Sequence, residues 1–262
     1  MDRLINGFEY FRRVTFPEKQ QLLKKLARAQ NPHTMIITCA DSRVAPEFFT
    51  SAEPGELFVC RNVGNIVPPY AQFTGGVSAA IEYAISVLGV RDIIVCGHSD
   101  CGAMKASLNP EAVAEFPAVS AWLRHAHIAK HVVDKNYECE NGKDAMLAMT
   151  EENVIAQLDH LRTHPAVAAR LASGRLGIHG WVFDIETAQI KAYSGEHRKF
   201  VMLEDVVALK DPSKLPRATP PARLTMRVNA VLADDALDDH HQRDDDFDDA
   251  MNERYAQKVG EV

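Results

Sequence analysis

Two stretches decide the fold: Thr34-Met-Ile-Ile-Thr-Cys39-Ala-Asp41-Ser-Arg43 and Asp92-Ile-Ile-Val-Cys-Gly-His98-Ser-Asp-Cys101-Gly102. Each begins with a short apolar run, which is typical of a strand buried on both faces of a parallel sheet. Between them, Gly75-Gly76 opens a helix that runs to about Leu88, where Gly89 ends it. Strand, helix and strand in this order predict a right-handed βαβ crossover. We therefore expect an α/β fold with a central, mostly parallel β-sheet flanked by helices.

The segments around this unit are predicted from their periodicity. Residues 2–30 are expected to be helical, and Leu57-Phe-Val-Cys60 is expected to be a strand. The helix after Gly76 is predicted to bury Ala79, Ala80, Tyr83, Ala84 and Val87. Further helices are predicted at 102–108, 117–130 and 150–162, the last with Thr150 as its N-terminal cap, and a final strand pair at 176–184 and 189–193.

Composition limits the classes of function. The chain has 262 residues, a formal net charge of −7 and 46% hydrophobic residues, and a nucleic-acid binder would normally be basic. A run of apolar residues long enough to span a membrane is missing from the sequence, and the first residues carry no secretory signal pattern. The five cysteines do not suggest a disulfide framework, so we expect a reducing, cytoplasmic setting.

The composition changes after the last expected strand. We predict a compact domain over 1–205 and a Pro-rich linker with an acidic C-terminal tail over 206–262. Residues 210–223 hold four prolines, and residues 234–249 hold nine Asp. The spacing of these Asp residues does not match an EF-hand loop, so a solvated tail is the expectation.

Cys39, His98 and Cys101 are the candidate metal ligands. All three follow predicted neighbouring strands, and the carboxyl ends of parallel strands are where ligands bind in such sheets. Two thiolates and an imidazole favour zinc over magnesium or calcium. The fourth position is left to Asp41 or to water. Of the other thiols, Cys60 and Cys96 are expected to be buried apolar groups and Cys139 an idle thiol in a polar loop.

These residues resemble the β-class carbonic anhydrases, whose Cys-x-Asp-x-Arg and His-x-x-Cys motifs match Cys39 to Arg43 and His98 to Cys101. The resemblance runs from about residue 3 to about 200. Flanking motifs also match, and they are Pro54-Gly-Glu-Leu-Phe58, Arg61-Asn-Val-Gly-Asn65, Gly75-Gly76, Glu82-Tyr83 and His179-Gly-Trp-Val182. Within the family the chain is most similar to the bacterial enzyme associated with cyanate breakdown, notably in Glu152-Asn-Val-Ile-Ala-Gln-Leu158 and Thr163-His-Pro165.

The resemblance implies reversible hydration of carbon dioxide to bicarbonate by a zinc-bound hydroxide, with one Zn²⁺ per subunit. It implies that Asp41 either binds zinc or pairs with Arg43, and that these two residues are catalytic. It also implies a small substrate pocket lined by Gln30, Phe58, Val63 and Tyr83. Part of that pocket is expected to come from a neighbouring subunit, so the N-terminal helices should pack on a partner in a homodimer or a higher homo-oligomer.

A subset of this family is inhibited by bicarbonate at a second site built from a Trp, an Arg and a Tyr. Here Arg61 is present, but Ile36 and Phe183 stand where the Trp and the Tyr would be. We therefore expect this inhibition to be absent, and water rather than Asp41 to hold the fourth zinc position at pH above about 8.

Two rival functions remain from sequence alone. The first is a hydrolase of carbon disulfide or carbonyl sulfide on the same fold, because its metal ligands would look alike. The second is a non-catalytic zinc-thiolate protein, which should lack the Asp41–Arg43 pair that this chain retains.

Overall fold

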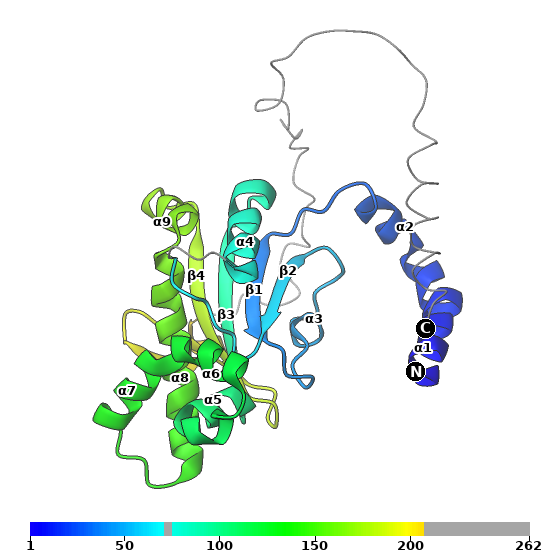
Figure 1. Cartoon of the computed structure of the whole chain (residues 1–262). Helices are drawn as coiled ribbons and strands as arrows, with labels where there is room; N and C mark the ends of the chain where they lie inside the picture. The colour runs from blue at the N-terminus through cyan, green and yellow to red at the C-terminus, as the bar shows by residue number, and fades with distance from the viewer. Residues whose placement is uncertain (71–74, 207–262) are drawn as a thin grey trace, which may run out of the picture. The chain divides into compact units, whose positions relative to one another are not determined.

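The computed structural model describes residues 1–70 and 75–206, within one compact unit that spans Met1–Lys210 (Figure 1). The linker expected at 210–223 and the acidic block expected at 234–249 lie outside the described residues. Among the helices that the structure describes, none combines the length and the apolar character needed to cross a membrane.

A six-stranded sheet forms the centre of the described unit, with the strand order β2-β1-β3-β4-β5-β6. The first four strands in this order are parallel, and the last two pair antiparallel at one edge. The predicted, mostly parallel α/β sheet is therefore confirmed. The strands are β1 (Thr34–Cys39), β2 (Leu57–Asn62), β3 (Asp92–His98), β4 (Gly177–Phe183), β5 (Ile190–Ser194) and β6 (Lys199–Met202). Strand β6 was not expected, because four residues give almost no periodicity to detect.

The helices connect and cover these strands, and several carry short π or 3₁₀ turns. At the N-terminus lie α1 (Asp2–Tyr10), a π-helical stretch η1 (Phe11–Thr15) and α2 (Phe16–Leu26), followed by α3 (Pro46–Phe49). The crossover consists of α4 (Gly76–Glu82) and η2 (Tyr83–Leu88). After β3 come α5 (Gly102–Leu108), η3 (Pro110–Val113), α6 (Pro117–Leu123), η4 (Arg124–Ala126), α7 (His127–Asn136), α8 (Gly142–Arg162) and α9 (Pro165–Ala172), and α10 (Leu203–Val206) follows β6.

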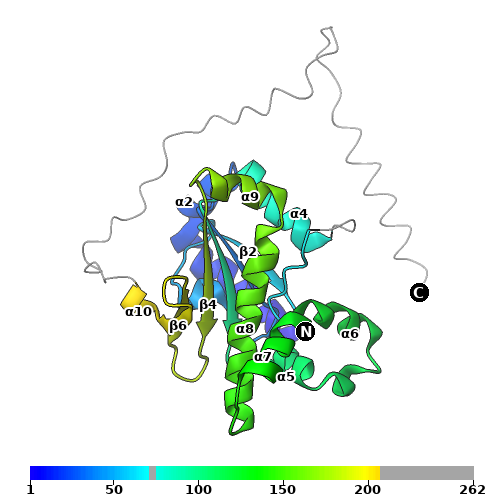
Figure 2. The ribbon, with the colours of Figure 1, turned by 90° about the vertical axis from the view of Figure 1, so that its left-hand side faces the viewer.

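Alternate residues of the central strands pack on opposite faces of the sheet. Met35 and Ile37 of β1 belong to the larger core cluster, which α4, η2, α8 and α9 complete from one side. Ile36 of the same strand belongs to a smaller cluster on the other face, together with Ile94 and Phe183. Helix α8 lies against β3 and β4 (Figure 2). Because both faces of β1 and β3 are covered, the carboxyl ends of these strands are held in fixed positions.

The helix predicted to start at Thr150 begins eight residues earlier, so that prediction is wrong. Helix α8 starts at Gly142, and the side chain of Asn141 caps it by accepting from the backbone N–H groups of Lys143 and Asp144 at 2.9 and 3.1 Å. Thr150 lies inside the helix and donates its hydroxyl to the carbonyl of Met146 at 2.8 Å. Asn is at least as good an N-cap as Thr, so the earlier signal determines where the helix starts.

The predicted apolar face of the crossover helix is also wrong in part. Ala84 is buried as expected, but Tyr83 and Val87 are exposed. The buried positions are Val77, Ser78, Ile81, Ala84 and Ile85. Two overlapping stripes of apolar residues occur in this helix, and the bulkier stripe with two isoleucines packs on the sheet because it buries more apolar area.

The N-terminal helix presents large apolar side chains to solvent within the single chain. Leu4, Ile5 and Phe8 are 72%, 55% and 60% exposed, and α1 contains no buried residue. A contiguous apolar surface of this kind marks an interaction site more often than it marks ordinary surface. The packing of this helix on a partner subunit stays a prediction.

Candidate metal centre

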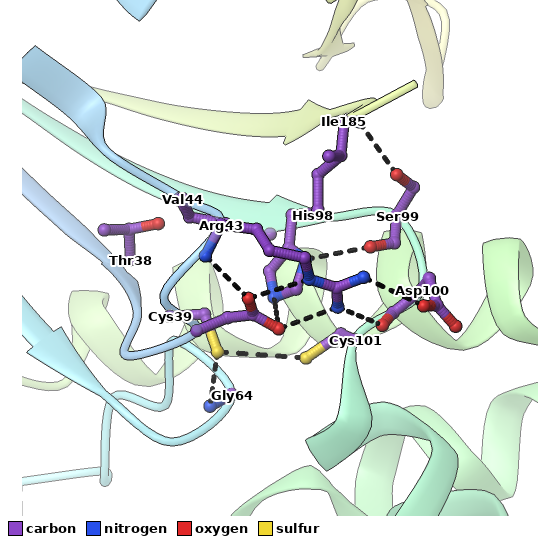
Figure 3. A network of polar contacts seen from close by, with 12 residues as sticks. Thr38, Cys39, Arg43, Val44, Gly64, His98, Ser99, Asp100, Cys101 and Ile185 are labelled. Carbon is purple, nitrogen blue, oxygen red and sulfur yellow. Dashed lines mark hydrogen bonds and ion pairs between the residues drawn. The ribbon is translucent and has the colours of Figure 1, made fainter. Parts of the chain in front are cut away.

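The two decisive stretches bring three metal-ligating side chains together. Cys39 is the last residue of β1, His98 is the last residue of the neighbouring parallel strand β3, and Cys101 immediately precedes α5. Their ligand atoms all lie within 4.8 Å of one another, and the side chains are buried (Figure 3). Among the residues that the structure describes, this is the cluster of His, Cys, Asp or Glu that could hold a metal ion.

The geometry of the cluster fits zinc. The sulfurs of Cys39 and Cys101 are 3.9 Å apart, and two thiolates on a tetrahedral zinc at about 2.3 Å would be separated by about 3.8 Å. His98 Nδ1 donates to the carbonyl of Ser99 at 2.8 Å, because a carbonyl oxygen can only accept. In the neutral ring this leaves a lone pair on Nε2, an atom that is buried without a hydrogen-bond partner. A buried, unpaired imidazole nitrogen beside two thiols is the donor set of a metal site.

The two thiols differ in acidity. The pKa of Cys39 is lowered to about 4, chiefly because Cys101 donates to its sulfur. His98 and the backbone N–H of Gly64 also lower this pKa, whereas burial raises it. The N–H of Gly64 lies 3.4 Å from the sulfur. The pKa of Cys101 is raised, because its proton is held by Cys39 and because burial disfavours its charged form. The two sulfurs thus share a hydrogen bond, and the pair gives up its first proton more readily than its second.

Asp41 lies beside the cluster and is held by Arg43. Arg43 donates to both carboxylate oxygens, from Nε at 3.0 Å and from Nη2 at 2.8 Å. These hydrogen bonds keep the pKa of Asp41 well below its usual range. The Oδ2 atom of Asp41 is 3.9 Å from His98 Nε2, so the carboxylate borders the potential metal ligands while it remains bonded to Arg43.

Asp100 anchors the other side of Arg43, and sequence reasoning missed this role. Its carboxylate accepts from Arg43 Nη1 at 3.0 Å and its backbone carbonyl accepts from Nη2 at 3.0 Å. The available signal was its position inside the His98–Cys101 motif, where an acid lies beside Arg43 of the first motif. Arg43 thereby connects the two motifs across the strand ends (Figure 3).

Arg61 on β2 supports the first motif from the neighbouring strand. It donates to the backbone carbonyls of Cys39 at 3.2 Å, Asp41 at 2.7 Å and Val44 at 2.7 Å. Because these carbonyls belong to the loop that carries Cys39 and Asp41, Arg61 fixes the path of that loop.

The four pocket residues implied by resemblance are only partly brought together. The rings of Phe58 and Tyr83 face each other at 6.0 Å between centroids. Val63 directly precedes Gly64, which contacts Cys39, and Val63 and Tyr83 are 45% and 44% exposed. Gln30 is exposed in the segment between α2 and β1. The role of these residues as a pocket stays a prediction.

The remaining cysteines do not belong to the ligand cluster. All five cysteines are free. Cys96 is fully buried in β3, where burial raises the pKa of its thiol to about 12, so it is the buried apolar group that was expected. Cys60 is only partly buried, and burial raises the pKa of its thiol as well. Cys139 is also partly buried, between α7 and α8.

A parallel sheet with two thiols and an imidazole at adjacent strand ends defines an α/β metalloprotein with a thiolate–imidazole site. Comparison with known proteins makes this class specific. Residues 34–190 match the family model described as carbonic anhydrase, so the chain belongs to the carbonic anhydrase family and is an enzyme of that family.

Individual relatives agree with this assignment. A carbonic anhydrase of Pseudomonas aeruginosa is 51% identical over 205 residues, which cover 78% of this chain and 93% of the relative. Carbonic anhydrase 1 of Escherichia coli O157:H7 is 49% identical over 203 residues, which cover 78% of this chain and 92% of the relative. The solved structure of the β-carbonic anhydrase CcaA superimposes with a TM-score of 0.75 at 42% identity, covering 77% of this chain and 91% of that one. The fold is therefore that of the β-class.

Proposed function

We propose that this chain catalyses the reversible hydration of carbon dioxide to bicarbonate, with one Zn²⁺ per subunit bound by Cys39, His98 and Cys101. One observation carries the proposal: two sulfurs and an imidazole nitrogen, spaced as zinc ligands are, lie next to the ionised carboxylate of Asp41. The two sulfurs are 3.9 Å apart, and Asp41 Oδ2 is 3.9 Å from the unpaired His98 Nε2. Zinc bound there would supply the Lewis acid that lets water lose a proton near neutral pH.

Asp41 would orient the reacting water. A carboxylate accepts hydrogen bonds only, so an ionised Asp41 could accept a hydrogen bond from the O–H of the attacking group and thereby direct the lone pair of that group at carbon dioxide. Arg43 supports this role in two ways. It keeps Asp41 ionised, and it occupies both oxygens so that the carboxylate stays beside the ligand cluster.

Phe58, Val63, Tyr83 and Gln30 would line the approach of the small apolar substrate. Val63 and Tyr83 are nearly half exposed in the single chain, which suits a pocket that a second subunit completes. The exposed apolar face of α1 would form part of that subunit contact. Relatives of known structure support an oligomer, since two β-carbonic anhydrases from Sordaria macrospora are described as tetrameric. The matching chain is 27% identical, has a TM-score of 0.66, and covers 73% of this chain and 95% of that one.

The five free cysteines support a reducing, cytoplasmic location. The similarity to the enzyme associated with cyanate breakdown suggests that the bicarbonate is used in a pathway of that kind. Bicarbonate-dependent growth on cyanate, compared between cells with and without this chain, would test the suggestion.

The experiment that tests the proposed reaction is stopped-flow hydration of carbon dioxide, with and without a zinc chelator, run beside hydrolysis of carbonyl sulfide and carbon disulfide. The proposal predicts chelator-sensitive hydration of carbon dioxide that far exceeds turnover of either sulfur analogue. Faster hydrolysis of a sulfur analogue would favour the rival hydrolase. Tight zinc binding without turnover of any of the three substrates would favour a non-catalytic zinc-thiolate protein.

A further inference from the structure

A buried polar face of α8 forms hydrogen bonds with the backbone of residues 63–68, the segment that follows β2. Asn153, Gln157 and His160 lie at helical spacing on this face, and each is at most 8% exposed. Polar side chains this deeply buried are costly unless they are hydrogen-bonded. Their partners include backbone groups of Gly64 and Val67, which lie outside any strand between β2 and Pro68-Pro69.

The bonds form a ladder along the segment. Asn153 Nδ2 donates to the carbonyl of Gly64 at 3.1 Å, and the N–H of Val67 donates to Gln157 Oε1 at 2.9 Å. His160 Nδ1 lies 2.9 Å from the carbonyl of Val67, and His164 Nε2 lies 3.0 Å from that of Pro68. The helix thus satisfies backbone groups that the sheet does not, and it fixes the path of the segment.

Gly64 is the point where this segment meets the metal centre. Its N–H points at the sulfur of Cys39, at 3.4 Å (Figure 3). Its backbone has a φ of +80°, and a Cβ there would lie 3.0 Å from the Cβ of Ala103 and 3.1 Å from the Cε of Met104. Only glycine suits both this conformation and this space, so the close approach of the Gly64 N–H to the Cys39 sulfur depends on a glycine at position 64.

Both peptide units that flank Gly64 are held by side chains from outside the segment. The carbonyl of Val63, which shares a peptide plane with the N–H of Gly64, accepts from the indole Nε1 of Trp122 at 2.8 Å. The carbonyl of Gly64 itself accepts from Asn153. Because a peptide unit is planar, fixing the carbonyl of Val63 fixes the direction in which the N–H of Gly64 points.

We propose that Trp122 and Asn153 are positioning residues for the zinc centre, which act by aiming the N–H of Gly64 at the sulfur of Cys39. The inference rests on the proposed zinc site. An N–H bond to a metal-bound thiolate shares the charge of the sulfur and orients its lone pairs. Loss of such an outer contact typically costs about tenfold to a hundredfold in metal affinity or activity. Hydrogen bonding of the Val63 carbonyl also polarises the peptide and strengthens its N–H as a donor.

The test substitutes phenylalanine for each of the two tryptophans in the full-length zinc-loaded enzyme. Trp122→Phe removes the indole N–H and keeps an aromatic ring at the same place. Trp181→Phe is the matched control, because Trp181 lies in β4 and packs in the cluster on the other face of the sheet. The two readouts are the rate of zinc release to a chromophoric chelator and the thiolate-to-metal charge-transfer band of the cobalt-substituted protein.

Trp122→Phe is expected to release zinc about tenfold faster and to shift the cobalt band, while Trp181→Phe behaves as the unsubstituted protein does in both measurements. Asn153→Leu should change both readouts in the same direction, and Trp122→Phe alone decides the matter if that variant does not fold. Unchanged release and an unchanged band in Trp122→Phe would overturn the inference, as would equal acceleration in both tryptophan variants. These two outcomes leave the proposed function standing, whereas failure of the unsubstituted chain to bind zinc would overturn both.

Discussion

The guanidinium of Arg43 binds both carboxylate oxygens of Asp41, with Nε 3.0 Å from Oδ1 and Nη2 2.8 Å from Oδ2. The backbone N–H of Arg43 donates a third hydrogen bond to Oδ1 at 3.0 Å. The remaining guanidinium nitrogen binds Asp100 on the second motif. The carboxylate is therefore ionised and fixed at the edge of the candidate metal ligands. A protein that only binds zinc would not need the Asp41–Arg43 pair, whereas an enzyme that orients a reacting water would.

Arg43→Ala should lower the turnover of carbon dioxide hydration by about tenfold to a hundredfold, because an outer contact of the reacting centre is lost. The freed carboxylate would compete with water for the zinc. Zinc content, measured by atomic absorption, should stay near one per chain, since Arg43 is not a ligand. Arg43→Lys is the conservative comparison, and it should recover only part of the rate because an ammonium cannot bind both carboxylate oxygens as the planar guanidinium does. Full turnover in Arg43→Ala would contradict the assigned role.

Replacing either candidate sulfur ligand should remove zinc. Cys39→Ser and Cys101→Ser are each expected to lose most bound zinc and nearly all activity, since a hydroxyl is a poor substitute for a thiolate at zinc. Cys139→Ser is the matched control, because Cys139 lies outside the cluster, and it should retain both. Equal zinc loss in the control and the ligand variants would argue against the assignment.

Zinc uptake by the metal-free protein at pH 8 should release about two protons rather than three. One comes from Cys101, whose pKa is raised, whereas the pKa of Cys39 is lowered to about 4 and this group has no proton left to lose at pH 8. The other comes from the zinc-bound water, which the proposed function requires to ionise near neutral pH. Zinc affinity should accordingly weaken more than tenfold for each unit that the pH falls near pH 8. Calorimetry in buffers of different ionisation enthalpy measures the proton count. Release of three protons would show that both thiols are protonated before zinc binds.

Charges placed on the apolar face of α1 should break the oligomer. The double variant Ile5→Glu/Phe8→Glu changes side chains that are 55% and 60% exposed in the single chain. It is expected to shift the protein toward monomers in sedimentation experiments and to lower activity, because the pocket would lose the partner's contribution. Asn6→Glu adds a charge on the opposite side of the same helix and should keep the assembly. An unchanged sedimentation profile of the double variant would place the interface elsewhere.

Bicarbonate should inhibit this enzyme only as a product. The donors of Arg61 already bind the backbone carbonyls of Cys39, Asp41 and Val44. Ile36 is fully buried, and Phe183 stacks on Phe49 with the ring centroids 4.5 Å apart, so neither can supply the missing polar partner. Initial rates measured over a range of bicarbonate concentrations should follow simple competitive inhibition. A sigmoidal inhibition curve would reveal a second binding site.

The sheet and the meeting of the three candidate ligands were predictable because their signals are local. Continuous apolar runs mark buried strands, and Cys39, His98 and Cys101 follow those runs directly, so parallel pairing of β1 with β3 brings the three together. The start of α8 was misplaced because Thr150 is a plausible cap in sequence, and only the fold shows that Asn141 acts first. The buried face of the crossover helix was misassigned because two apolar stripes compete for the sheet.

The contacts that support the site could not be predicted because they join distant parts of the chain. The bond from Trp122 to Val63 spans 59 positions, and the bond from Asn153 to Gly64 spans 89. A buried Asn or Gln has no periodic signature, and its partner here is a backbone carbonyl, which every residue carries. The stretch 152–158 matched the family motif in sequence, but only the structure shows that Asn153 and Gln157 within it hydrogen-bond to the backbone of Gly64 and Val67.

Loss of ¹⁸O label from bicarbonate directly reports whether zinc held by Cys39, His98 and Cys101 supports the hydration of carbon dioxide. This exchange is followed by membrane-inlet mass spectrometry for the purified, the metal-stripped and the zinc-reloaded protein. We expect rapid loss of label that falls to the uncatalysed rate when zinc is stripped and recovers in proportion to the zinc restored, up to one ion per chain. Loss of label at the same rate in the stripped and reloaded protein would contradict this expectation.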